Sequence, residues 1–86
     1  MSKLLRNRRG ATKLGQELGK RVRSIRQRKA WSLEELAERA GMHATYLSSI
    51  ERGHRNPTLN VIGSLARGLA VSLSELLAGV ENGSEP

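Results

Sequence analysis

The chain has 86 residues, no cysteine and a formal net charge of +7. This length is enough for one small helical core but not for a roomy enzyme cleft, and the lack of cysteine excludes disulfides and thiolate metal sites. No apolar run approaches the roughly 18 residues of a membrane span, and residues 1–13 lack the apolar core of a signal peptide, so a cytoplasmic protein without membrane contact is expected.

The basic residues are concentrated in the first third of the chain. Residues 1–29 hold eleven basic residues and one acidic residue, a balance of +10, whereas residues 30–86 hold four basic and seven acidic residues, a balance of −3. This asymmetry favours a polyanionic partner, and nucleic acid ahead of a membrane because no lipid-facing apolar stripe accompanies the charge. A solvated basic face is the alternative.

Both ends of the chain are predicted to be flexible. Residues 1–13 are basic with little apolar content, and such an arm can add affinity for nucleic acid through phosphate contacts. The alternative is a passive solubilising tail. Residues 81–86 are polar, acidic and predicted to be disordered, which leaves residues 14–80 as the folded domain.

The first helix is predicted over residues 14–29. Its apolar residues recur at spacings of four, four and three, which places them on one core-facing stripe, while basic residues, Arg23 among them, occupy the other faces. Arg26 lies next to this stripe, where a partly buried charge needs a partner, and Glu51 on a later helix is the expected one. Two independent solvated charges are the alternative. The stripe consists of Leu14, Leu18, Val22 and Ile25.

The stretch LEELAERAGMHATYLSSI, residues 33–50, has the spacing of two short helices joined by a tight turn. Ser32 is predicted to cap the first of these helices, with Glu35 completing a capping box and Trp31 packing as a hydrophobic staple. The apolar period stops at Gly41, which accepts the positive φ that such a turn requires. The sequence therefore predicts a helix-turn-helix.

The second helix of this motif, residues 44–52, is expected to bury Leu47 and Ile50 and to end at Gly53. At about 100° per residue, its small polar residues point away from the buried side and are expected to be exposed. Such a surface fits the major groove of B-DNA, where Ser and Thr contact several base edges with weak discrimination. An ordinary solvent-exposed face is the alternative. The residues concerned are Thr45, Ser48, Ser49 and Arg52.

The loop HRNPT follows, and the amides of Arg55 and Asn56, together with the Arg55 side chain, are expected to hold a phosphate. Thr58 is predicted to cap a fourth helix over residues 59–69, and Ser72 to cap a short fifth helix. The core stripe of the fourth helix is expected to be Leu59, Ile62, Leu65, Ala66 and Leu69.

The two C-terminal helices carry more aliphatic residues than one small core needs. A homodimer interface is therefore expected at this end of the chain, and complete burial within one monomer is the alternative. The interface candidates are Val61, Leu73, Leu77 and Val80.

Two segments, SLEELAERAGMHATYLSSIERG and RNPTLNVIGSLARGLAVSLSELL, resemble the lambda-repressor-like helix-turn-helix domain of the Cro/CI or Xre transcriptional regulators. The resemblance covers residues 18–77 and implies an all-α, five-helix DNA-binding fold, a bacterial or phage origin and association with the nucleoid. Within this family the chain is also similar to the controller proteins of restriction-modification systems, which are homodimers that bind palindromic operators and regulate their own promoter.

The resemblance also implies roles for individual residues. The Arg–Glu pair of the family falls on Arg26 and Glu51. Two positions depart from the family pattern. Leu33 stands where many members have a glutamine that bonds phosphate or supports a base contact, and His43 stands where members often cap the recognition helix with serine or threonine. The implied base-reading positions are Ala44, Thr45, Ser48 and Ser49. The implied positions near the DNA backbone are Tyr46, Arg52, His54, Arg55 and Asn56. Arg23 and His43 are further candidates for contacts with the DNA backbone.

Catalytic chemistry is not expected. The chain has no aspartate, so it lacks a Ser-His-Asp set, and His43 and His54 lack the spacing of a metal pair. We therefore expect no enzyme activity, metal, cofactor or small-molecule ligand. The predicted function is that of a homodimeric, sequence-specific transcriptional regulator that binds double-stranded DNA. The rival is an antitoxin or adaptor whose helix-turn-helix domain mainly binds a protein partner.

Overall fold

A computed structural model describes residues 12–82 of the chain, and this part contains helices and no strand. The predicted all-α fold with five α-helices is confirmed. Residues 1–11 of the expected basic arm and residues 83–86 of the expected tail lie outside the described residues. The elements are α2 (Lys13–Arg28), α3 (Leu33–Ala40), α4 (Ala44–Glu51), α5 (Leu59–Leu69), α6 (Leu73–Leu77) and the 3-10 helix η2 (Val80–Asn82).

Hydroxyl side chains start four of these helices. At Ser32 the hydroxyl accepts from the Glu35 amide at 3.0 Å while the Glu35 carboxylate accepts from the Ser32 amide at 2.7 Å, so the predicted capping box is present. The predicted caps at Thr58 and Ser72 are present as well. A cap that the sequence reading missed is Thr12, whose hydroxyl accepts from the Gly15 amide at 3.0 Å and starts α2.

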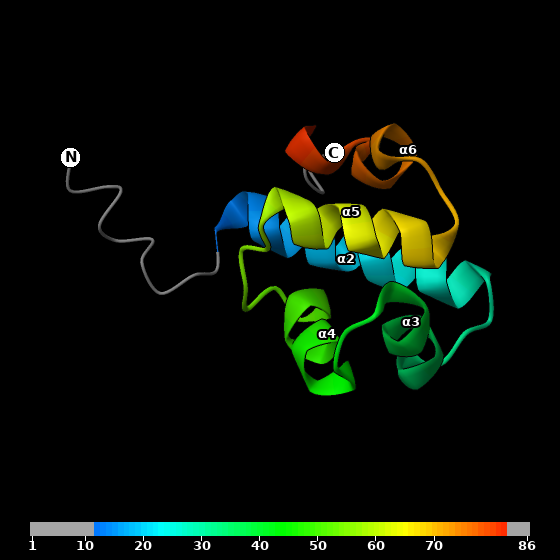
Figure 1. The fold of residues 1–86 in the computed structure, drawn as a ribbon. Helices are drawn as coiled ribbons and strands as arrows, with labels where there is room; N and C mark the ends of the chain where they lie inside the picture. The colour runs from blue at the N-terminus through cyan, green and yellow to red at the C-terminus, as the bar shows by residue number, and fades with distance from the viewer. Residues whose placement is uncertain (1–11, 83–86) are drawn as a thin grey trace.

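The core lies where α2, α3, α4 and α5 meet. Helix α2 contacts α4 on one side and α6 with η2 on the other, while α3 packs against α5 (Figure 1). Each large apolar side chain buried there contributes about 1.5–3 kcal/mol by leaving water. The fully buried large side chains are Val22, Ile25, Leu36, Leu47, Ile50, Leu65, Leu69 and Leu76.

Glycines set two close helix crossings and the turn of the motif. A Cβ built on Gly19 of α2 would collide with the backbone carbonyl oxygen of Ile50 in α4. A Cβ on Gly68 of α5 would lie 2.9 Å from Cα of Ala40 in α3. Gly41 ends α3 with φ of 70°, as predicted for the turn. These crossings place α4 close against α2, and α5 close against α3.

Three apolar residues lie elsewhere than predicted. Leu14 and Leu59, assigned to core stripes, are 57% and 71% exposed, and each stands in the first turn of its helix. Val80, assigned to a dimer interface, is only 8% exposed and belongs to the core cluster because η2 packs against α2.

None of the described helices is by itself long and apolar enough to cross a membrane. Helix α5 reaches the length and apolar composition of a membrane span only when it is joined to Leu73–Asn82, and the two segments are bent by 104°.

Candidate nucleic-acid interface

Helix α4 is fixed to α2 by an ion pair between Arg26 and Glu51. Arg26 Nε donates to Glu51 Oε2 at 2.7 Å, and Arg26 Nη2 donates to Glu51 Oε1 at 2.9 Å, which is the two-pronged geometry of a strong guanidinium–carboxylate pair. Arg26 Nη1 also donates to the carbonyl oxygen of Trp31 at 2.9 Å. The hydrogen bond to Glu51 raises the pKa of Arg26, so this side chain stays charged. The pair expected from the sequence is thus present, and Arg26 also binds the loop before α3.

The outer side of α4 and the loop after it form one hollow of about 590 Å³. Seven of the eleven residues predicted to face DNA line it, which brings the recognition helix and the HRNPT loop into one surface. Two arginines and two histidines line the hollow, and none of its described lining residues is acidic, so it favours an anion. Its lining residues are His43, Thr45, Tyr46, Ser49, Arg52, His54 and Arg55.

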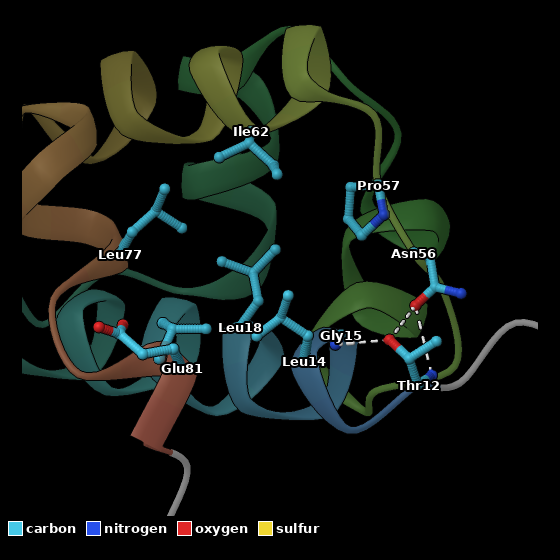
Figure 2. Close-up of a pocket in the computed structure, with 10 residues that line it drawn as sticks. Thr12, Leu14, Gly15, Leu18, Asn56, Pro57, Ile62, Leu77 and Glu81 are labelled. Atoms are coloured by element: carbon cyan, nitrogen blue, oxygen red, sulfur yellow. Dashed lines mark hydrogen bonds between the residues drawn. The ribbon is translucent and has the colours of Figure 1, made fainter.

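The other four predicted residues lie outside this hollow. Ala44 and Ser48 are half-buried on α4, and Arg23 is exposed on α2. Asn56 faces α2 instead: its Oδ1 accepts from Thr12 Oγ1 at 2.8 Å and from the Thr12 amide at 3.3 Å (Figure 2). Asn56 therefore ties the loop to Thr12, the residue that caps α2.

Ser49 differs from its predicted environment. Its side chain was expected to be exposed, but Ser49 is only 8% exposed. The hydroxyl donates to the carbonyl oxygen of Tyr46 at 2.7 Å and accepts from Arg55 Nε at 3.2 Å. The reason is the path of the loop, which returns to α4 through a hydrogen bond from the His54 amide to the Ser49 carbonyl oxygen at 2.9 Å. Helical spacing alone could not include this loop.

The N-terminus of α2 supports the loop that carries Arg55. A Cβ built on Gly15 would lie 2.8 Å from the Arg55 carbonyl oxygen, so only glycine lets the loop come this close to α2. With the Thr12–Asn56 hydrogen bonds, this contact fixes the loop at two adjacent residues, through the backbone of Arg55 and the side chain of Asn56. The sequence reading missed Thr12 and Gly15 as parts of the site. A threonine directly before a helical pattern was the available signal for the first of them.

His43 precedes α4 without a side-chain cap hydrogen bond, as expected for a weak capping residue. Its exposed ring instead lines the hollow. Trp31 lies outside the hollow, partly buried against the core, with the Arg39 guanidinium carbon 3.9 Å from its ring centroid. This arrangement agrees with a packing role for Trp31.

A second hollow is apolar and lies beside the N-terminal end of α2, between this helix, α5 and α6. It has a volume of about 520 Å³ and adjoins the Thr12–Asn56 contact, which contributes its polar edge (Figure 2). The apolar side chains lining the hollow are Leu14, Leu18, Pro57, Ile62, Leu77 and Val80.

The described residues contain no group of three or more His, Asp or Glu placed to hold a metal ion.

Comparison with known proteins links this geometry to a family. The model of the helix-turn-helix family matches residues 22–76. The control protein C.SmaI of Serratia marcescens is 43% identical over 67 residues, which cover 76% of this chain and 80% of that protein. The solved structure of the restriction-modification controller protein C.AhdI from Aeromonas hydrophila matches with a TM-score of 0.70 and 37% identity, covering 72% of this chain and 94% of that one.

Other relatives are longer. The HTH-type transcriptional regulator DdrOP3 of Deinococcus deserti is 38% identical over 65 residues, which make up 76% of this chain but 50% of that protein. The chain thus spans half the length of this relative and most of the length of C.SmaI.

Proposed function

Because this chain belongs to the Xre/Cro-like helix-turn-helix family of transcriptional regulators, we propose that it is a sequence-specific regulator that binds double-stranded DNA. The observation that carries the proposal is the hollow formed by α4 and the loop after it. Its lining combines short polar side chains with two arginines and two histidines and contains no acidic residue. A major groove admits one helix, and the positive charge beside it suits the flanking phosphates.

In the proposed complex, one set of residues contacts the bases and another contacts the phosphates. Ala44, Thr45 and Ser48 on α4 meet base edges, where the hydroxyls accept or donate hydrogen bonds and the methyl groups contact thymine. These short side chains discriminate weakly, so specificity also depends on DNA shape and on a second subunit. The proposed phosphate contacts come from Arg23, His43, Tyr46, Arg52, His54, Arg55 and the Asn56 amide.

The regulator is proposed to act as a homodimer on a palindromic operator near its own promoter. Similarity to the control protein C.SmaI and the controller protein C.AhdI supports this finer assignment. Leu73 on α6 is 43% exposed, and Val61 and Leu77 are half-buried, so apolar surface remains at this end of the monomer. No catalytic role is proposed.

Footprinting on the DNA upstream of the gene tests the proposal. Two protected half-sites are expected about 34 Å apart on one face of the duplex. Replacing Arg52 by alanine should weaken binding and reduce the slope of log affinity against log salt by about 0.9 if one phosphate contact is lost. Arg67→Ala is the matched control, because Arg67 is exposed on α5 and lies outside the hollow, and it should leave the slope unchanged. Absence of any duplex affinity at low salt would refute the proposal.

A further inference from the structure

Ser49 is the only one of the four base-reading candidates whose side chain is buried. A hydroxyl has a single proton to donate, and that of Ser49 is used in the 2.7 Å hydrogen bond to the Tyr46 carbonyl oxygen. The oxygen in turn accepts from Arg55 Nε at 3.2 Å. Both partners of the Ser49 hydroxyl are thus protein groups on the lining of the hollow.

Arg55 is held from several directions although its side chain is exposed. Nε is bound to Ser49, and the guanidinium carbon lies 5.6 Å from the centroid of the Tyr46 ring. The backbone of the same residue rests against Gly15, and the next residue is bound to Thr12. The loop and the side chain are therefore both ordered before any ligand arrives.

The outer end of Arg55 remains available. Among the described residues, neither Nη group of Arg55 makes a hydrogen bond. A guanidinium is planar, so fixing Nε also restricts the plane in which both Nη groups present their protons. Two parallel N–H donors in a fixed plane match two oxygens of a phosphate.

We propose that Ser49 is a positioning residue, which orients Arg55 to grip a DNA phosphate and does not itself read a base. This inference rests on the proposed DNA-binding function and refines the task of two residues within it. Ordering a long side chain only when the complex forms weakens binding by about two- to tenfold. The Ser49 hydroxyl avoids most of that loss because it orders Arg55 in the free protein.

A double-mutant cycle on the full chain tests the proposal. Dissociation constants are measured at one salt concentration for two duplexes, the footprinted upstream site and an unrelated sequence. Ser49→Ala should weaken binding to both duplexes by the same factor, about two- to tenfold, because a phosphate contact carries no sequence information. In the Arg55→Ala background, Ser49→Ala should have no further effect, since the side chain that it orients is gone.

Matched variants separate this role from folding. Ser64 on α5 also accepts from an arginine, Arg67 Nη2 at 3.4 Å, but lies outside the hollow, so Ser64→Ala should leave both dissociation constants unchanged. Ser49→Thr retains the hydroxyl and should restore binding. Ser49→Cys keeps the size of the side chain but hydrogen-bonds weakly, and it should reproduce the loss even if the alanine variant folds poorly.

Two results would overturn the positioning role. One is a change in the preference of Ser49→Ala between the two duplexes, which would show that Ser49 reads a base. The other is additivity of the Ser49 and Arg55 effects, which would show that the two residues act independently. If the wild-type protein binds neither duplex at low salt, the DNA-binding function itself fails, and the inference fails with it.

Discussion

The guanidinium of Arg26 holds the recognition helix to the rest of the domain through two hydrogen bonds of 2.7 Å and 2.9 Å to Glu51. The side chains are 13% and 6% exposed, so removing either partner leaves the other charge largely shielded from water. Such an unpaired charge is strongly destabilising, whereas the intact pair contributes modestly.

We expect Arg26→Ala to lower the free energy of unfolding by roughly 1–4 kcal/mol, because Glu51 loses its partner. Chemical denaturation measures this change. Arg28→Ala is the control, since Arg28 is exposed on the same helix, and its effect should stay within about 0.5 kcal/mol. An unchanged midpoint for Arg26→Ala would contradict the assigned role of the pair.

The pH dependence of the stability that Arg26 contributes follows from the direction in which its pKa is shifted. The pKa of Arg26 is raised in the folded protein by its hydrogen bond to Glu51, so its stabilising effect is complete below the unfolded value and is lost only as the pH rises through the folded value. Both values lie far above neutrality. Titration of Arg26 should therefore not change the difference in free energy of unfolding between wild type and Arg26→Ala across the neutral pH range.

Residue pairs were predictable where a charge pattern or a short sequence interval indicated them. Arg26 and Glu51 could be paired because each was the available opposite charge beside an apolar stripe, and Ser32 with Glu35 follows from a three-residue interval. The environment of Ser49 was not predictable in this way, since its burial depends on a loop that begins five residues later, at His54, and folds back. Thr12 and Asn56 are 44 residues apart, and no sequence periodicity connects them.

At the scale of the elements, the crossing of α2 and α4 depends on Gly19. A Cβ at this position would collide with the Ile50 carbonyl oxygen and lie 2.8 Å from that of Glu51, and both atoms are backbone, which cannot rotate away. The crossing therefore sets how α4 is presented to DNA. Helix spans could be predicted from apolar periods and caps, but this crossing could not, because helical glycines look alike in sequence.

Gly19→Ala should destabilise the protein by about 1–3 kcal/mol, since α2 and α4 must separate to admit the methyl group. The control is Gly63→Ala on α5, where the added Cβ would have no atom within 4 Å apart from its chain neighbours and the backbone of its own helix. There the better helix propensity of alanine should stabilise the protein by up to about 1 kcal/mol. Opposite shifts in melting temperature are thus expected, and shifts of the same sign would show that the crossing is not the cause.

At the scale of the whole molecule, the proposed dimer depends on which apolar residues the monomer leaves exposed. Counting aliphatic residues in the sequence indicated a surplus but could not place it. The structure buries Val80 and exposes Leu14 and Leu59, and it leaves Leu73 on α6 43% exposed beside the fully buried Leu76. A substitution at Leu73 is therefore the most direct test of the proposed dimer interface.

We expect Leu73→Glu to dissociate the proposed homodimer, because a carboxylate placed in an apolar interface would lose its hydration without a partner. Its effect on the monomer should be small, since the side chain is already partly in water. Sedimentation equilibrium measures the state of association, and footprinting should then show weaker occupancy of both half-sites. Ser74→Glu adds the same charge at the next exposed position of α6 and should leave the dimer intact. Equal association by both variants would place the interface elsewhere, and a monomeric wild type at the concentrations that protect DNA would remove the dimer from the proposal.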